Sequence, residues 1–341
     1  MTPTVSIVTL TYNHERFLAQ CLESVRAQSF EGWEQIIIDD GSTDETPAIV
    51  ARHADPRIRY VRCEHGGVEE IPNRYVSGLE LCRGELIAFL DGDDYWPADS
   101  VEILSSALRD DRDLALAYGR TETVGDIAAT GLPSVIPTPE ARARFGRSVF
   151  FNDPVGSATE AMLDPKHLTF FFLTASLIRR SVLSRIGGLK RLEGLPVVDY
   201  PTLLRLTLEG RFHYVESTTA FWRVHGHSTT TNRWSQIVTG AYRQASRFRA
   251  EYSGRLPAAS RDGLGSDWEA VHIGEHFLAR GRDLLRAGRW DDARAHLTSA
   301  LGFRLPAVGR LLALVHWLST VVRFDLVALL KRLRPPRSGA G

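Results

Sequence analysis

Short apolar runs alternate with amphipathic stretches over about the first ninety residues of the chain. Runs of strand length lie at residues 5–10, 35–38, 58–62 and 86–90. Between them apolar residues recur at helical spacing, which predicts helices over about 15–28, 44–53 and 68–82. We expect Asn13 to cap the first of these helices. Strands that alternate with helices in this order predict an α/β fold with a Rossmann-like, mostly parallel sheet flanked by helices.

Acidic residues follow two of the apolar runs at the point where each run ends. Asp39 and Asp40 follow the second run, and Asp91-Gly92-Asp93-Asp94 follows the fourth. The fourth run lacks polar alternation, which predicts a strand buried on both faces, and carboxylates at its end need a partner. Because parallel strands place their carboxyl ends on one edge of the sheet, we expect both acidic segments to meet in one site. Carboxylates suit Mg²⁺ or Mn²⁺; an acidic turn that caps the next helix is the alternative.

The pattern is less regular after residue 96. A helix is expected over 97–108 and a strand over 114–118, whereas prolines interrupt residues 119–166, which form either part of an acceptor site or a surface insertion. Further on we expect strands at 170–178 and 212–215, helices at 181–189 and 201–208, and a loop at 226–233. Residues 268–300 are expected to be helical and to include one helix-turn-helix unit similar to a tetratricopeptide repeat.

Composition narrows the class of protein. A length of 341 residues suggests about two domains, and a formal net charge of zero gives no reason to expect a nucleic-acid partner. The three cysteines form no Cys-x-x-Cys pair, which favours a reduced, cytoplasmic protein. We expect no signal peptide and no transmembrane helix. The first strand is followed by no Gly-x-Gly-x-x-Gly and no phosphate-binding loop with Gly-Lys-Ser/Thr, which argues against a dinucleotide dehydrogenase and a P-loop enzyme.

Residues 4–230 resemble the family 2 glycosyltransferases, which have the GT-A fold. The resemblance is carried by the segments 5–13, 39–44, 84–85 and 90–94. It implies a metal-dependent, inverting transfer of a sugar from a nucleoside-diphosphate sugar to a hydroxyl acceptor. By the same resemblance, Thr11, Tyr12 and Asp40 line the base of the donor, and the Asp-x-Asp holds Mn²⁺ or Mg²⁺ on the diphosphate.

The resemblance also divides the acidic cluster. Asp93 is expected to be the direct metal ligand, and Asp91 to support the metal and lie nearer the sugar or ribose, while Asp94 is left as the cap of the next helix. An Arg-Asn pair of the family corresponds to Pro72 and Asn73. This assigns Asn73 to the donor site. Arg74 is adjacent and could substitute for the family arginine, but a residue one place on points about 100° away on a helix.

Two later segments complete the expected site. An inverting transfer needs a base for the acceptor hydroxyl, and Asp199 corresponds to the acidic catalytic residue of the family, with Val198 in place of a common glutamate. The alternative for Asp199 is an N-cap of the following helix. The segment 221–225 resembles an aromatic-Arg-x-His segment, in which Arg223 would face the leaving diphosphate and His225 would ligate the metal or be structural.

These inferences define the expected organisation. We expect a GT-A domain over residues 1–235, with a nucleotide-sugar half (1–118) and an acceptor half (119–235), and a helical C-terminal region over 236–341. The donor is expected to be a UDP-sugar and the acceptor a glycan or a lipid-linked glycan of bacterial surface polysaccharide. Residues 305–333 are apolar with several arginines, which indicates either peripheral contact with the inner face of a membrane or a packed helical hairpin. Three alternatives are a non-catalytic sugar-nucleotide-binding module, a phosphohydrolase of the haloacid dehalogenase type and, more weakly, a nucleotidyltransferase.

Overall fold

The computed structural model describes residues 3–125, 133–163, 172–189, 197–256 and 267–326. They fall into two compact units that divide near residue 261. The boundary expected at residue 235 falls in the first turn of α12 (Trp234–Tyr252), whereas the whole of this helix belongs to the first unit. Its buried residues include Val238 and Phe248, and it packs against α10 (Asp199–Leu206).

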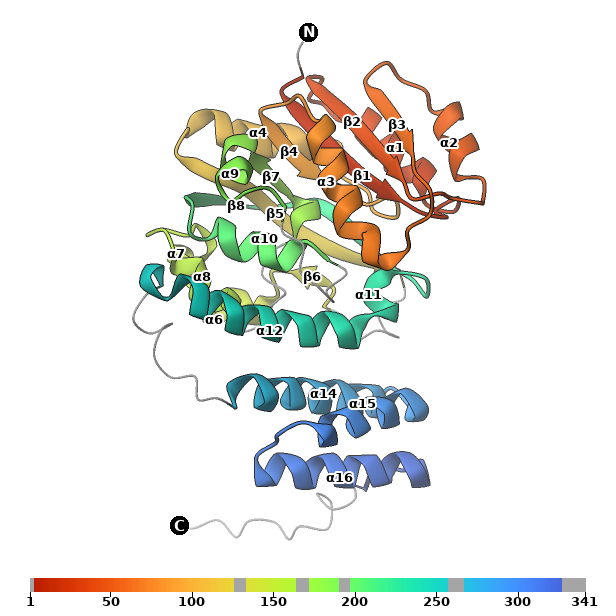
Figure 1. Ribbon diagram of the computed structural model, residues 1–341, viewed down its shortest axis with the longest axis vertical. Coiled ribbons are helices and arrows are strands. Elements are labelled where there is room, and N and C mark those ends of the chain that lie inside the picture. The colour runs from red at the N-terminus through yellow and green to blue at the C-terminus, as the bar shows by residue number, and fades with distance from the viewer. Residues whose placement is uncertain (1–2, 126–132, 164–171, 190–196, 257–266, 327–341) are drawn as a thin grey trace, which may run out of the picture. The chain divides into compact units, whose positions relative to one another are not determined.

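A mixed sheet, eight-stranded in the described residues, forms the centre of the first unit (Figure 1). Its order is β3-β2-β1-β4-β7-β5-β6, and β8 pairs with β5. The strands are β1 (Val5–Thr11), β2 (Trp33–Asp39), β3 (Ile58–Arg62), β4 (Leu86–Phe89), β5 (Leu114–Gly125), β6 (Val135–Ile136), β7 (Ser176–Arg179) and β8 (Arg211–Val224). The pairs among β1 to β4 are parallel, and so is the pair of β5 with β8. β7 is antiparallel to its neighbours β4 and β5, and β6 is antiparallel to β5. This confirms the mostly parallel sheet expected from the sequence.

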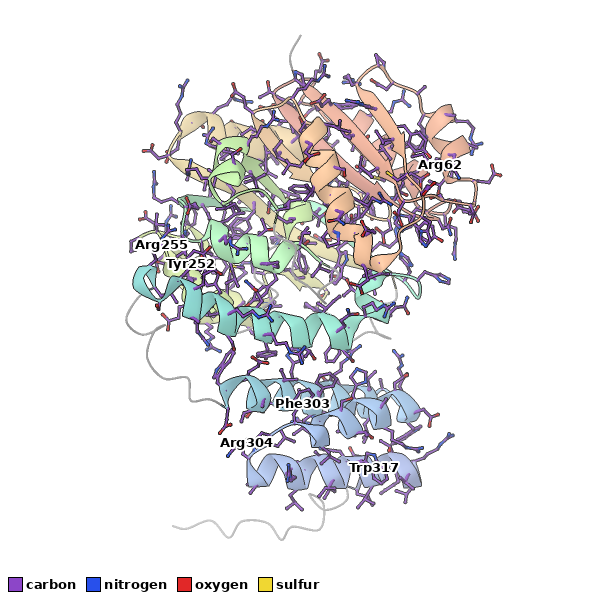
Figure 2. The ribbon with its side chains drawn as sticks, in the orientation of Figure 1. Arg62, Tyr252, Arg255, Phe303, Arg304 and Trp317 are labelled. Atoms are coloured by element: carbon purple, nitrogen blue, oxygen red, sulfur yellow. The ribbon has the colours of Figure 1, made fainter. Side chains whose placement is uncertain are left out.

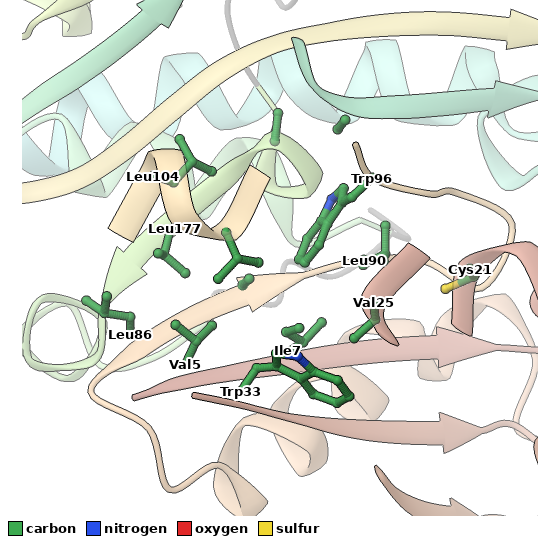
Figure 3. Packing of buried hydrophobic residues seen from close by; sticks show 14 of the residues in the cluster. Val5, Ile7, Cys21, Val25, Trp33, Leu86, Leu90, Trp96, Leu104 and Leu177 are labelled. Carbon is green, nitrogen blue, oxygen red and sulfur yellow. The ribbon is translucent and has the colours of Figure 1, made fainter. Parts of the chain in front are cut away.

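Helices cover both faces of the sheet. On one face, α1 (Leu18–Arg26), α2 (Thr46–Arg52) and α4 (Ser100–Asp110) pack onto alternate strand residues such as Val5 and Ile7, in one apolar cluster (Figure 3). The intervening residues point to the other face, which α3 (Ile71–Leu81) covers. The contact there is close, since a Cβ at Gly78 would lie 2.5 Å from Val8 Cγ1. The period of two along the strands therefore fixes which helix each side chain meets.

The start of α1 differs from the expectation. The helix begins at Leu18 with Phe17 at the N-cap position, so the capping role assigned to Asn13 is wrong. Asn13 has a positive φ of 51° and its side chain accepts a hydrogen bond from Thr43 N–H at 2.8 Å. Asn13 therefore links the turn after β1 to the turn after β2.

The segment after β4 is more ordered than its sequence pattern indicates. β5 and β8 extend well beyond the expected strands, and their pairing contains register shifts. Such irregularities interrupt the alternation of side chains, which is why the pattern ended early. The interval that prolines interrupt contains α6 (Pro139–Arg144), α7 (Arg147–Phe150) and α8 (Ser157–Leu163). The described part of the unit also contains the short helical elements η1 (Val68–Glu70), η3 (Leu173–Ala175), α9 (Arg180–Arg185), α11 (Thr229–Asn232) and η4 (Ser253–Arg255).

The second unit consists, in the described part of the chain, of α14 (Trp268–Arg286), α15 (Trp290–Gly302) and α16 (Ala307–Val322). The expected helix-turn-helix is confirmed: α14 and α15 are joined by a turn in which Gly288 has a φ of +74°. Leu284, Leu285 and Ala293 form a small apolar cluster with Trp290. The end of the expected segment 305–333 lies outside the described residues. Among the helices that are described, none is both long and apolar enough to span a bilayer.

Candidate active site

The parallel strands bring the two acidic segments to one edge of the sheet. In the register of β1 and β2, Thr11 lies beside Asp39, and Asp40 N–H donates to the Thr11 carbonyl at 2.9 Å. On the other side of β1, Gly92 N–H donates to the Leu10 carbonyl at 2.9 Å. β1 thus lies between the two acidic strand ends, and Thr11 is adjacent to both.

Three carboxylates are clustered beyond the end of β4. Asp91, Asp93 and Asp94 each place a carboxylate oxygen within 4.8 Å of the others. Tyr75 on α3 donates its hydroxyl to Asp91, and His225 Nε2 lies 3.0 Å from Asp93 Oδ2. The site therefore combines a loop after β4, a helix on one face of the sheet and a residue that follows β8.

The carboxylates of this cluster differ in acidity. Burial, together with the charge of Asp93, raises the pKa of Asp91 to about 8. Burial likewise raises the pKa of Asp94, whereas for Asp93 the effect of burial is outweighed by His225 and His14, which lower its pKa. A bound divalent cation would offset the repulsion between these groups. Oxygen ligands with one imidazole fit Mn²⁺ or Mg²⁺ by their chemistry.

Asp94 has a different place from the one expected. The residue at the N-cap of α4 is Asp99, so the capping role assigned to Asp94 is wrong. Asp94 is buried, and its Oδ1 accepts a hydrogen bond from Arg223 N–H at 2.8 Å. It therefore holds the end of β8 against the acidic loop after β4.

Arg223 lies at the centre of this junction. Its Nε donates to the Asp93 carbonyl at 2.7 Å, and its Nη2 donates to Gln20 Oε1 at 2.6 Å. Its guanidinium also lies 4.9 Å from the ring centroid of Phe17 and 5.2 Å from that of Tyr95. These contacts position the acidic loop, and a role at the diphosphate remains a prediction.

The sequence reasoning missed His14, which lies beside the cluster. The rings of His14 and His225 are 6.5 Å apart between centroids and nearly perpendicular. His14 Nδ1 and Thr11 Oγ1 are buried and have no hydrogen-bond partner among the described residues, and both approach Gly92 so closely that a Cβ there would lie within 2.9 Å. Burial lowers the pKa of His14. His14 directly follows the Thr11–Asn13 motif, but the pattern there indicated only the start of a helix.

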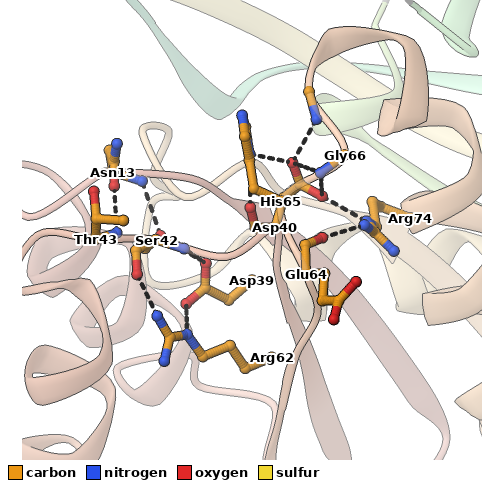
Figure 4. A network of polar contacts seen from close by, with 11 residues as sticks. Asn13, Asp39, Asp40, Ser42, Thr43, Arg62, Glu64, His65, Gly66 and Arg74 are labelled. Carbon is orange, nitrogen blue, oxygen red and sulfur yellow. Dashed lines mark hydrogen bonds and ion pairs between the residues drawn. The ribbon is translucent and has the colours of Figure 1, made fainter.

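Asp40 is held by a dense network of polar contacts (Figure 4). Its carboxylate accepts hydrogen bonds from the backbone N–H groups of Gly66 and Gly67 at 3.1 to 3.2 Å and from Arg74 Nε at 2.6 Å. His65 Nδ1 lies 2.9 Å from both the carbonyl oxygen and Oδ2 of Asp40. The ring of His65 stacks on that of Tyr12, with centroids 4.1 Å apart. The network joins the end of β2 to the turn after β3 and to α3.

Asn73 and Arg74 show the consequence of their spacing on α3. Asn73 Nδ2 donates to Glu70 Oε2 at 2.6 Å, whereas Arg74 points to Asp40. The structure thus brings Arg74, and not Asn73, to the acidic strand end. The sequence pointed to Arg74 only as the neighbour of the family pair, and it gave no signal for Tyr75; each is recognised by the carboxylate it meets across the fold.

Asp199 is the first residue of α10, and Val198 occupies the N-cap position, so the capping alternative for Asp199 is not observed. Its side chain is half-buried, and burial raises its pKa to about 6. Its charge contributes to the raised pKa values of Asp91 and Tyr75. Asp199 is therefore electrostatically coupled to the acidic cluster.

Comparisons with known proteins identify relatives and structures similar to this chain. The Escherichia coli enzyme WfgD, described as a UDP-Glc:alpha-D-GlcNAc-diphosphoundecaprenol beta-1,3-glucosyltransferase, is 31% identical over 128 residues, 37% of this chain and 49% of that one. The chain spans about a third of the length of the first curated relatives it matches.

Two solved structures share the fold. S. aureus TarS in complex with UDP-GlcNAc gives a TM-score of 0.51 at 15% identity, covering 94% of this chain and 92% of that one. A mannosyltransferase from Pyrobaculum calidifontis in complex with GDP-Man and Mn²⁺ also gives 0.51, at 20% identity, covering 97% and 86%. Both are glycosyltransferases of GT-A fold, which confirms the fold expected from the sequence.

The family model for glycosyl transferase family 2 matches residues 6–187, which include β1 to β4 and the acidic cluster. That family expectation is confirmed, and the phosphohydrolase alternative loses its support. The chain belongs to glycosyl transferase family 2.

Proposed function

We propose that this chain transfers a sugar from a nucleoside-diphosphate sugar to a hydroxyl acceptor, with inversion and with the help of a divalent cation. The observation that carries the proposal is the cluster of Asp91, Asp93 and Asp94, with Asp199 coupled to it, on the carboxyl edge of a family 2 domain. Open α/β sheets bind their ligands at this edge.

In this proposal Asp93 and His225 hold Mn²⁺ or Mg²⁺, and Asp91 supports the site. When bound, the cation neutralises charge on the leaving diphosphate. Support comes from the oxygen-rich donor set and from the Mn²⁺ in the complex of the Pyrobaculum mannosyltransferase. Tyr75 on α3 donates its hydroxyl to Asp91 Oδ1 and so fixes the orientation of this carboxylate toward the cation.

The donor base is proposed to lie against Thr11, Tyr12 and Asp40. Tyr12 is 38% exposed, so one face of its ring is available for stacking, while the other face contacts His65. UDP-sugars are the first donors to test, because relatives and neighbours are named for UDP-Glc and UDP-GlcNAc; the complex with GDP-Man makes GDP-sugars the second. Asn73 and Arg223 are proposed to contact the donor at the ribose or phosphates.

Asp199 is proposed as the base that takes the proton of the acceptor hydroxyl. A pKa of about 6 leaves this carboxylate ionised at neutral pH and more basic than an ordinary aspartate. The residue acts from the N-terminal end of α10, on the acceptor side of the expected site.

The acceptor is proposed to be a glycan or a lipid-linked glycan of bacterial surface polysaccharide, and the site of action the cytoplasmic side of the membrane. The name of the Escherichia coli relative supports this, since its acceptor is a diphosphoundecaprenol-linked sugar. The helical unit after residue 261 could contact the membrane or a lipid-linked acceptor in addition to the contacts made by the first unit.

A thermal-shift screen of sugar nucleotides tests the donor and the metal together. Ligands that bind only the folded chain stabilise it by about 2.7 kcal/mol at a hundred times their Kd. We expect a UDP-sugar to raise the Tm with Mn²⁺ present and to have little effect in EDTA. Asp93→Asn should lose the Mn²⁺-dependent part of the shift, and the exposed residue Asp291, in a matched Asp291→Asn variant, should retain it. Equal shifts in Mn²⁺ and EDTA would exclude the metal from the donor site.

A further inference from the structure

The polarity of α16 is the reverse of that of an ordinary surface helix. Its buried residues are small or polar: Ala313, His316, Ser319 and Thr320. Arg294 on α15 donates to Thr320 Oγ1 at 3.2 Å and to the Thr320 carbonyl at 2.9 Å. A surface helix normally turns its apolar side to the protein, so this packing leaves the apolar side of α16 without a partner among the described residues of its own unit.

The opposite side of α16 carries large aliphatic residues in solvent. Six of them are between 44% and 71% exposed and recur at spacings of three or four residues, so that they form one continuous apolar face: Val308, Leu311, Leu314, Leu318, Val321 and Val322. Phe324, just beyond the helix, is 53% exposed. Trp317 lies at the edge of this face and donates its indole N–H to Thr298 Oγ1 on α15 at 3.0 Å (Figure 2). Isolated exposed leucines are common on proteins, but a contiguous face of this kind marks an interaction site.

Most of the charged side chains on and next to this helix are positive, and one of them, Arg323, places Nη2 3.7 Å from Asp291 Oδ2 on α15. Arg310 and Arg323 are exposed on or next to α16, and the helix contains no aspartate or glutamate. The sequence that follows adds Lys331, Arg332, Arg334 and Arg337, and Asp325 is the single aspartate or glutamate after residue 306. The chain as a whole has a formal net charge of zero, so the excess is local.

We propose that the apolar face of α16 docks onto the surface of an anionic lipid bilayer. Aliphatic side chains flanked by arginines match the acyl boundary and the phosphate layer of such a surface. With sixteen residues, α16 is about 24 Å long, short of the roughly 30 Å hydrocarbon core, so the helix would lie in the plane of the interface. This inference does not rest on the proposed transfer reaction, because no residue of the acidic cluster takes part in it.

A second copy of the chain fits the same face less well. In a symmetric pair of α16 helices, Arg310 would meet an arginine of the other copy, and α16 itself contains no carboxylate to compensate; Asp291 on α15 lies near Arg323. Anionic lipid supplies that compensation. Self-association is therefore the competing outcome in the experiment below.

Co-sedimentation with lipid vesicles tests the proposal on the full chain. The probes are vesicles of phosphatidylcholine alone and of phosphatidylcholine with phosphatidylglycerol in equal parts. We expect binding to the anionic vesicles and much weaker binding to the neutral ones. Leu311→Gln/Leu318→Gln should weaken anionic binding at least about tenfold, since each leucine loses its apolar burial. Val155→Gln, at an apolar residue 49% exposed in the first unit, is the matched control and should bind as the unaltered chain does.

Two further measurements check the folding of the leucine variant and the contribution of the arginines. Circular dichroism melting should show that the double variant is folded, and Arg310→Gln/Arg323→Gln should weaken binding to anionic vesicles and not to neutral ones. The proposal is overturned if the double leucine variant sediments with vesicles as the unaltered chain does. It is also overturned if the unaltered chain is a dimer that the leucine changes dissociate while it ignores both kinds of vesicle.

Discussion

At the scale of single residues, the pKa values of Asp91 and Asp93, which are separated by one glycine, shift in opposite directions. The pKa of Asp91 is raised to about 8 by burial and by its neighbour, whereas His225 and His14 outweigh burial at Asp93 and lower its pKa. The sequence was enough to predict that the two acidic segments meet at one edge of the sheet. Of the groups that set these pKa values, His225 was expected beside the site by resemblance, whereas His14 and Tyr75 could not be predicted, because they come from other elements.

Asp199→Asn tests the base. We expect kcat to fall by about 10²- to 10⁴-fold while the Kd of the donor is unchanged, because the amide cannot accept the proton. The rate of the unaltered chain should fall as the pH drops through about 6, since the protonated carboxyl is inactive. The raised pKa also means that ionised Asp199 destabilises the folded state, so stability declines as the pH rises from about 4 to 6.

The free energy of unfolding of Asp199→Asn at pH 7 should therefore exceed that of the unaltered chain by about 1 kcal/mol. Urea unfolding at pH 7 and at pH 4 measures this difference, which should vanish at the lower pH. Retained turnover in Asp199→Asn would assign the base elsewhere.

At the scale of elements, α3 connects the two acidic strand ends. Arg74 binds Asp40, and Tyr75, the next residue, binds Asp91. The amphipathic pattern predicted this helix to within a few residues. It could not predict which side chain meets which carboxylate, and the family motif pointed to Asn73, which contacts Glu70 within its own turn.

A double-mutant cycle measures the link between Arg74 and Asp40. Their side chains are only 18% and 9% exposed, so we expect Arg74→Met to cost about 1–3 kcal/mol in the free energy of unfolding and to raise the KM of the donor. In the cycle, Asp40→Asn should be less harmful in the Arg74→Met background than alone. Additive effects of the two changes would mean that this ion pair contributes nothing to the turn after β3.

Gly78 tests how tightly α3 is seated on the sheet. A Cβ at this position would lie 2.5 Å from Val8 Cγ1, so Gly78→Ala should force the helix outward and cost about 1–3 kcal/mol despite its better helix propensity. A Cβ at Gly146 would meet no atom within 4 Å, which makes Gly146→Ala the control. Chemical denaturation should separate the two variants, and equal stabilities would contradict the close packing of α3.

At the scale of the whole molecule, the order of elements was the most predictable property. Buried strands such as β4 are short, uniform and followed by abrupt acidic turns, so their sequence alone defines them. The long pair β5 and β8 was recognised only at its start, because bulges shift the alternation of its side chains. The extent of the first unit also exceeded the expectation, since α12 completes it through contacts with α10 that no local pattern encodes.

Release of nucleoside diphosphate from a panel of UDP- and GDP-sugars, with Mn²⁺ or with EDTA, tests the central claim most directly. The assay should include glycan and lipid-linked acceptors, and Asp93→Asn and Asp199→Asn beside the unaltered chain. We predict turnover of at least one donor that depends on acceptor and Mn²⁺ and is lost in both variants. Full turnover in EDTA, or in either variant, would contradict the account of the site.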